Sequence, residues 1–191
     1  MFPDERVRKR GPPPTPLPLN ILVSLRYLAT GSSFKSLEIE SGVSKSTIST
    51  FYRTWAAWMV QEHFDSWVAI PSTEEEIRRI SSVFELLGIP GCTSSIDGLH
   101  VNRDNCPSKY RFVGKEGHPT LAWNVHCHHI GRVLSVNGAY VGGKNDKNIA
   151  RLDDMLKAAK TKDVYKAFPF TLCTSGGDPV DHFGAWVMCD G

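Results

Sequence analysis

The chain has 191 residues, of which 41% are hydrophobic, so it is long enough to bury a core and is not a disordered tail. It has no apolar run of membrane-spanning length and no apolar stretch behind its basic N-terminus, which argues against a secretory signal and predicts an intracellular, reducing location. The chain has five cysteines and no CxxC pair, which argues against a disulfide framework or a zinc ribbon. Its net charge is only +2, so any nucleic-acid surface must come from local basic clusters.

The N-terminal part of the chain is predicted to be an arm followed by a helical region. Residues 1–18 hold the basic run Arg6 to Arg10 and then five prolines, which cannot continue a helix. We interpret this run either as a segment for phosphate contact or nuclear import, or as a solvated tail. Residues 19–70 show helical spacing of apolar residues, with a turn at Gly42-Val43 and an N-cap at Ser44.

A short helix, a glycine-containing turn and a second capped helix have the sequence shape of a helix-turn-helix. The first turns of a recognition helix make base and phosphate contacts in such modules. The corresponding candidates for DNA binding are Lys45, Ser46, Thr47 and Arg53. The alternative is an ordinary turn in a helical bundle.

The rest of the chain alternates between helical and strand patterns. A connecting segment, residues 71–91, holds a helix predicted over 72–87, where Thr73 and Glu76 have capping-box spacing, as do Ser72 and Glu75. Residues 92–191 then predict a strand over 93–96, a hairpin over 120–128 and 133–140, a helix over 148–160 and a final strand over 184–189.

Two of these predicted strands end in Asp-Gly, at Asp97 and at Asp190. Adjacent parallel strands that end in this way would bring two carboxylates together, and paired carboxylates repel each other unless a cation lies between them. Mg²⁺ suits such a site, because it binds a few carboxylates and completes its shell with water and phosphate oxygens. The alternative is that Asp-Gly is a common turn dipeptide, and Asp146, just before a helix, has the alternative role of an N-cap.

A second metal hypothesis involves His126, Cys127, His128 and His129. Alternation along a strand puts His126 and His128 on one face, so one zinc ion would reach two of the four residues. The favoured interpretation is a set of strand histidines with Cys127 as a small hydrophobic residue.

Several segments follow one another along the chain as a collinear series of motifs. Two lie in the N-terminal helical region, Leu25 to Gly31 and Val43 to Thr47. The series continues with Ser95 to Val101 and Cys106-Pro107, then Gly114 to Val125, then Gly142 to Ile149 with Leu152 to Asp154, and ends with Gly184 to Gly191. In this order the segments resemble the N-terminal helical region, the first acid motif, the strand that follows it and the next two blocks of PIF/Harbinger-type DDE transposases.

This resemblance implies an α/β fold in which a helical region with a helix-turn-helix precedes an RNase H-like core over residues 92–191. It implies metal-dependent DNA cleavage and transfer at transposon ends, with Mg²⁺ or Mn²⁺ held by the catalytic residues Asp97 and Asp190. Asp146 is a further candidate metal ligand. The family's last acid, a Glu on a later helix, would lie beyond residue 191, so the core is expected to be incomplete and its activity doubtful.

The resemblance also implies DNA and a Myb-like accessory protein as partners, and a nuclear location. The alternative function is a non-catalytic remnant of a transposable element that binds DNA or a protein through residues 19–70. Nothing in the sequence indicates a membrane partner.

Overall fold

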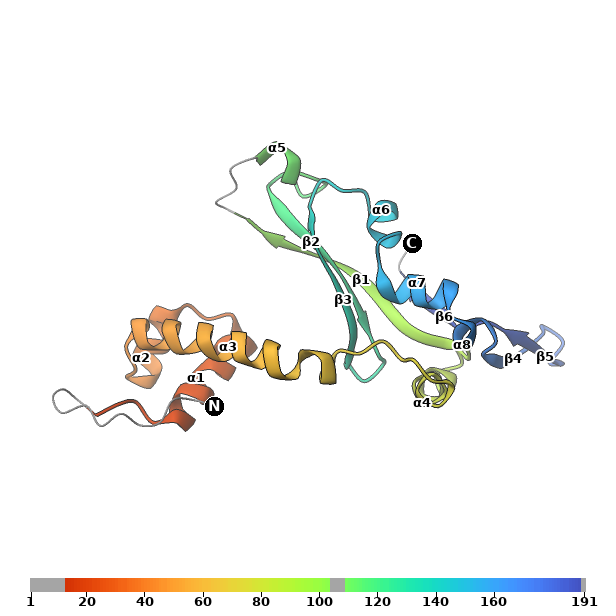
Figure 1. The fold of residues 1–191 in the computed structure, drawn as a ribbon, viewed down its shortest axis with the longest axis horizontal. Helices are drawn as coiled ribbons and strands as arrows, with labels where there is room; N and C mark the ends of the chain where they lie inside the picture. Colours follow the sequence, from red (N-terminus) through yellow and green to blue (C-terminus); the bar gives the residue numbers. More distant parts are fainter. Residues whose placement is uncertain (1–12, 104–108, 190–191) are drawn as a thin grey trace. The chain divides into compact units, whose positions relative to one another are not determined.

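The computed structural model describes residues 13–103 and 109–189, and over these residues the fold is mixed α/β (Figure 1). The chain divides into two compact units, residues 1–64 and residues 65–191. The basic run Arg6 to Arg10 lies outside the described residues. No described helix is long and apolar enough to cross a membrane.

The described part of the first unit holds α1 (Leu17–Thr30), α2 (Phe34–Ser41) and all but the last residues of α3 (Lys45–Trp67). α1 begins earlier than the predicted end of the proline-rich arm, because a proline is tolerated in the first turn of a helix, where Pro18 lies. α1 and α2 each end at a glycine in the left-handed conformation, Gly31 and Gly42. The core of the unit consists of four buried side chains, Val23, Leu37, Val43 and Ile48.

The predicted helix over 72–87 is confirmed as α4 (Glu74–Glu85). Of the two possible capping boxes, the structure forms the one between Thr73 and Glu76. α4 belongs to the second unit rather than acting only as a connector, because it supplies Ile77 to one hydrophobic cluster, with Met155 and Tyr165. Its Ile80 and Phe84 pack in a second cluster, with Cys92 and Leu134.

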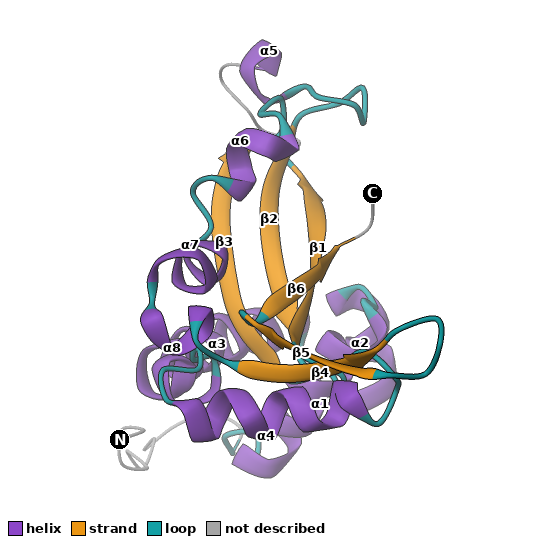
Figure 2. Cartoon of the chain, turned by 90° about the vertical axis from the view of Figure 1, so that its right-hand side faces the viewer, coloured by secondary structure: helices purple, strands orange, loops and turns teal. Residues whose placement is uncertain are grey.

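A four-stranded mixed sheet forms the centre of the second unit (Figure 2). Its strands are β1 (Cys92–Asn102), β2 (Thr120–Cys127), β3 (Val133–Val141) and β6 (Trp186–Cys189), and their order is β3-β2-β1-β6. β1, β2 and β3 are antiparallel neighbours, which confirms the predicted hairpin, whereas β6 is parallel to β1. The short helix α5 (Lys109–Phe112) lies between β1 and β2 in the sequence.

The prediction that the first strand ends at Asp97-Gly98 was wrong. β1 continues to Asn102, because β2 pairs with it from Ser95 to Asn102 and satisfies its backbone beyond Gly98. An Asp-Gly dipeptide is a turn signal only where no neighbouring strand competes for the backbone.

The helix predicted over 148–160 is two helices, α6 (Asp146–Ala150) and α7 (Asp154–Thr161). The break occurs at Asp153, whose backbone is extended and whose side chain accepts a hydrogen bond from the N–H of Leu156 as the N-cap of α7. A further short helix, α8 (Asp163–Lys166), follows.

An antiparallel hairpin that the sequence did not predict precedes the last strand. It consists of β4 (Pro169–Cys173) and β5 (Pro179–Phe183), which form a separate two-stranded sheet. Almost all of its residues are exposed, so it carries little of the alternating burial by which a strand is recognised. β4 packs close to Gly91, where a Cβ atom would lie 2.6 Å from the ring of Phe170.

Candidate functional site

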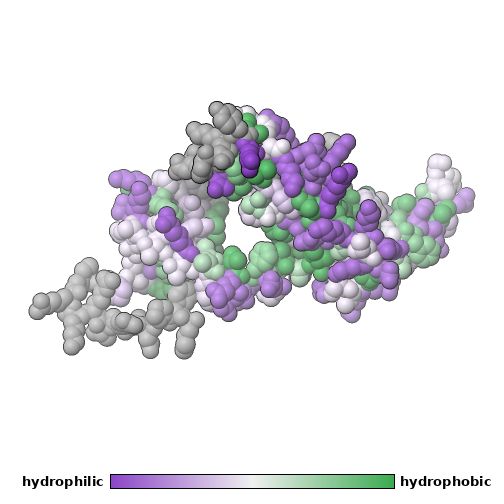
Figure 3. All heavy atoms as spheres, turned by 45° about the horizontal axis from the view of Figure 1, so that its top comes forward, coloured by the Kyte–Doolittle hydropathy of each residue, from purple (hydrophilic) through white to green (hydrophobic). Residues whose placement is uncertain are grey.

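Asp97 lies in the middle of β1, and its side chain is exposed. It is paired with Val125 of β2. Because side chains alternate along a strand, Asp97 shares one face of the sheet with Leu99 and Val101, which are 53% and 46% exposed. Figure 3 shows hydrophobic residues, in green, that reach the surface among hydrophilic ones. The Asp97 carboxylate is therefore accessible to a large substrate.

The strand that leads to the second predicted acid lies beside β1. In the parallel pairing of β1 with β6, Met188 is opposite Ser95 and Cys189 is opposite Ile96. Asp97 follows Ile96 in the sequence and Asp190 follows Cys189, but Asp190 lies outside the described residues, as do Cys106 and Pro107. The adjacent parallel strands of the paired-carboxylate hypothesis are present, but only part of that hypothesis is met, because β1 continues past Asp97 instead of ending there.

Asp146 is the first residue of α6, and its side chain is 77% exposed, with one oxygen 3.9 Å from Lys115 Nζ. The N-cap is its neighbour Asn145, whose side chain accepts from the N–H of Lys147 at 2.8 Å. The chain reaches Asp146 from β3, whose last residue, Val141, is paired with Leu121 of β2. Leu121 lies four residues along β2 from Val125, the partner of Asp97. That is about 13 Å along the strand. Within residues 13–103 and 109–189, no three His, Cys, Asp or Glu side chains form a group that could hold a metal ion.

A buried polar network that the sequence analysis missed lies on the opposite face of the sheet. His126 Nε2 and Asp153 Oδ1 are 2.9 Å apart, and both side chains are fully buried. Ser94 Oγ lies 3.2 Å from His126 Nδ1, and Asn124 Nδ2 donates to Asp153 Oδ2 at 3.3 Å. The network links β1 and β2 to the start of α7. The signal in the sequence was the polar pair Asn124 and His126 at alternate positions of an otherwise apolar strand.

The network is satisfied internally. Burial raises the pKa of Asp153, but the hydrogen bonds from His126, the N–H of Leu156 and Asn124 outweigh burial and hold the pKa below its usual range. Because an ionised carboxylate can only accept, the Nε2–H of His126 donates to Asp153, and Nδ1 on the other side of the ring lies within hydrogen-bond distance of the Ser94 hydroxyl.

A serine, a histidine and an acid in this order can act as a nucleophilic relay. Ser94 is completely buried, however, so no substrate atom reaches its hydroxyl. The network therefore positions α7 on the sheet and does not form a reactive site.

The histidines of the zinc hypothesis have separate partners. His126 is bound to Asp153, whereas His128 Nδ1 accepts from the N–H of Ile130 at 3.3 Å and its ring packs edge-on against Phe84. Burial lowers the pKa of His128, and the nearby charges of His129 and Arg132 lower it further. These contacts favour the interpretation that these residues are structural histidines of a strand.

The candidate DNA-binding residues occupy the first turns of α3. Lys45, Ser46 and Arg53 are exposed, and Thr47 is half-buried. Ser44 caps the helix, because its hydroxyl accepts from the N–H of Thr47 at 3.3 Å. The predicted cap is therefore confirmed. Lys45 and Arg53 both lie on the helix that this cap begins.

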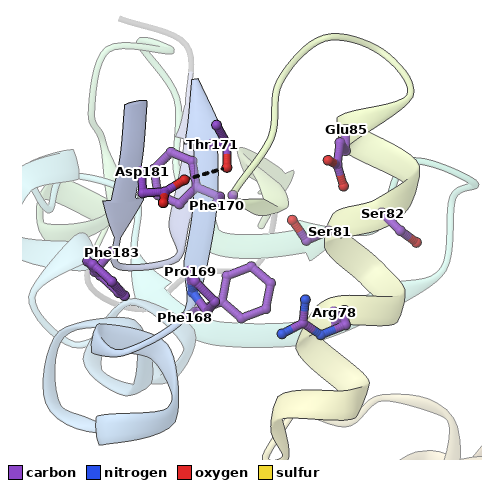
Figure 4. Close-up of a pocket in the computed structure, with 11 residues that line it drawn as sticks. Arg78, Ser81, Ser82, Glu85, Phe168, Pro169, Phe170, Thr171, Asp181 and Phe183 are labelled. Atoms are coloured by element: carbon purple, nitrogen blue, oxygen red, sulfur yellow. Dashed lines mark hydrogen bonds between the residues drawn. The ribbon is translucent and has the colours of Figure 1, made fainter. Parts of the chain in front are cut away.

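A pocket of about 320 Å³ lies between α4 and the β4–β5 hairpin (Figure 4). Arg78 projects from α4, with its guanidinium over the ring of Phe168 and a salt bridge to Glu74. On the other wall Thr171 donates to Asp181 at 2.8 Å. These polar groups of the lining are already paired with one another or with neighbouring residues, so the pocket offers a weaker site for chemistry than Asp97.

No protein-family model, no curated protein and no solved structure matches this chain. Support for a function therefore comes from the residues and geometry of the chain itself.

Proposed function

We propose that the second unit carries the metal-dependent nuclease core of a PIF/Harbinger-type DDE transposase, with Asp97 and Asp190 as its first two acids. The observation that carries the proposal is the parallel pairing of β6 with β1, in which Cys189 lies opposite Ile96. The two acids follow these two residues in the sequence. The antiparallel neighbours β2 and β3 extend the sheet on the other side of β1, and in the proposal these four strands belong to an RNase H-like core.

The side chains available suit a hard divalent cation. Asp97 is an exposed carboxylate on an open sheet face, and carboxylate oxygens are the ligands that Mg²⁺ and Mn²⁺ prefer. When bound, such ions activate the attacking water and stabilise the leaving oxygen in phosphodiester cleavage. Asp146, beside Lys115, is a candidate ligand or neighbour of the site.

In this proposal the first unit is the DNA-binding part. α2, a three-residue turn and α3 would form its helix-turn-helix, with Lys45, Ser46, Thr47 and Arg53 on the helix that would enter a groove. A Myb-like accessory protein and a nuclear location belong to the same proposal, and their support is the resemblance alone.

The proposal is tested by nicking of supercoiled plasmid with Mg²⁺ or Mn²⁺. Wild-type protein is expected to nick the plasmid only when metal is present, and Asp97→Asn to lose this activity, because a neutral amide binds the cation far more weakly. Asp163→Asn is the matched control, since Asp163 is an exposed acid on α8 in the same unit. Equal nicking by the wild type and by Asp97→Asn would refute the proposed role of Asp97.

The second candidate function is a non-catalytic remnant that binds DNA or a protein. It is favoured by the first unit, whose core of Val23, Leu37, Val43 and Ile48 forms without any residue of the sheet. Sequence-selective DNA binding that depends on Lys45 and Arg53, with no nicking under any metal condition, would support this alternative and contradict the nuclease.

A further inference from the structure

Cationic side chains gather at the end of the sheet where β1 finishes and α6 begins. We call this set the basic loop cluster: Arg103, Arg111, Lys115, Lys144 and Lys147. Lys144 is half-buried and the other four residues are exposed. They come from three segments of the chain, so their proximity is a product of the fold and not of a charge run in the sequence.

Close backbone packing joins these segments. A Cβ atom on Gly143 would lie 2.9 Å from the carbonyl oxygen of Val113 and 3.1 Å from that of Arg111, and one on Gly114 would collide with the carbonyl of Gly142. The N–H of Gly142 donates to the carbonyl of Thr120 at 2.9 Å. Glycine is required for such an approach, since a side chain would separate the loops. The two loops that carry Arg111, Lys115, Lys144 and Lys147 are thus fixed against each other.

The charges of the basic loop cluster are only partly neutralised. The guanidinium of Arg103 lies over the ring of Phe112 at 5.0 Å, and Lys144 Nζ lies over the ring of Tyr140 at 5.1 Å. These rings hold the side chains in place and leave their charge available. Among the described side chains of these loops the acids are Glu116 and Asp146, against five cations. The salt bridge of Lys115 with Asp146 is long and exposed, so a phosphate can displace it at little cost.

We propose that the basic loop cluster binds the phosphates of duplex DNA. This inference rests on the proposed function, and it adds where the substrate is held. A polyanion with regularly spaced charges fits a set of cations drawn from several loops better than a single small anion does. Arg103 lies six residues beyond Asp97 along β1, or about 20 Å. If the duplex follows β1 from Asp97, the phosphates that reach this cluster would be about six nucleotides away from the cleavage site.

The test measures how the affinity for a random 30-bp duplex depends on salt, with EDTA present so that cleavage does not interfere. Each phosphate contact contributes about 0.9 to the slope of log K against log salt. A variant with Lys115→Gln, Lys144→Gln and Lys147→Gln is expected to lower the slope by about 2 to 3. The matched control carries Lys157→Gln, Lys160→Gln and Lys162→Gln, the same change in charge at exposed positions of α7 and its C-cap. The control is expected to keep the wild-type slope.

The outcomes separate this inference from the nuclease. The single variant Lys147→Gln, at an exposed position, is expected to lower the slope by about 0.9, which checks the result if the triple variant is unstable. Equal slopes for the two triple variants, or no binding of the duplex at 50 mM salt, would overturn the inference. If no protein, the wild type included, nicks the plasmid but the salt slopes are those expected, only the nuclease proposal is refuted. Intact nicking with unchanged slopes refutes only the basic loop cluster.

Discussion

Replacement of His126 by leucine should destabilise the second unit by about 3 kcal/mol, because it leaves the buried Asp153 carboxylate without its strongest donor. His126 and Asp153 are both fully buried, and their atoms are 2.9 Å apart. A hydrogen bond to a charged group contributes about 1.5–3 kcal/mol, and a buried polar group left without its partner costs a further desolvation penalty of about 1–3 kcal/mol, or more when the group is charged. The donors that remain, Asn124 and the N–H of Leu156, keep the expected loss at the lower end of that range.

The charge is responsible for most of the expected loss, and Asp153→Asn tests this point. Asparagine is an equally good N-cap, so this variant should keep the bond to Leu156 and lose only about 1–2 kcal/mol. The double variant His126→Leu/Asp153→Asn should lose less than the sum of the two single variants, because no charge is left unpaired in the core.

Hydrogen exchange of the β2 amides is the appropriate assay, since it reports on the second unit alone in a chain with two units. His118→Leu is the control, as His118 is exposed in the same unit, and the loss of its exposed hydrogen bonds to Glu116 and Asn102 should cost about 1 kcal/mol or less. If His126→Leu costs no more than His118→Leu, the network does not hold α7 on the sheet.

The network also predicts a dependence of stability on pH. The pKa of Asp153 in the folded state is below its unfolded value of about 3.9. The ionised carboxylate therefore contributes its full stability above that value and loses it as the pH falls through the folded pKa. The difference in unfolding free energy between wild type and Asp153→Asn should be constant above about pH 5 and shrink below about pH 4.

Three further substitutions test other parts of the fold. Thr73→Ala removes the capping box of α4 and should cost about 1 kcal/mol in the urea unfolding of the second unit; an unchanged midpoint would contradict the cap. Leu37→Ala leaves a cavity in the core of the first unit and should cost about 3 kcal/mol, seen as an earlier loss of helical circular dichroism, whereas the exposed Ile39→Ala should have little effect. Gly142→Ala puts a methyl group 2.7 Å from the carbonyl oxygen of Phe112 and should cost about 1–3 kcal/mol, with faster exchange of amides near Thr120; wild-type exchange there would show that the loops are not closely packed.

Local signals of the sequence predicted the helices of the first unit, α4 and the β2–β3 hairpin. In each case a cap, a glycine or a regular apolar spacing lies within a few residues of the element that it defines, as Ser44 does for α3 and Thr73 does for α4. Such local information does not depend on the rest of the fold.

Long-range contacts decided the features that the sequence analysis predicted wrongly or missed. β1 extends past Gly98 because β2 pairs with it, and the helix after β3 breaks because Asp153 turns inward to His126, which lies 27 residues earlier. The same contact joins the residues of the buried network, which lie on β1, β2 and α7. For the proposed metal site, the sequence predicted a strand at Asp97 with a parallel neighbour, which β1 and β6 confirm, but the metal ligands stay a prediction. The level of Asp146 along the sheet could not be predicted, because it depends on the packing of loops around Gly142.

Binding of Mn²⁺ by the full chain, followed by paramagnetic broadening of backbone amide resonances, tests most directly whether a metal site is centred on Asp97. Broadening should be strongest at Ile96 to Gly98 and at their strand partners Val125 and Cys189, and should disappear in Asp97→Asn but not in Asp163→Asn. Broadening that is centred elsewhere, or that persists in Asp97→Asn, would contradict the proposed metal site.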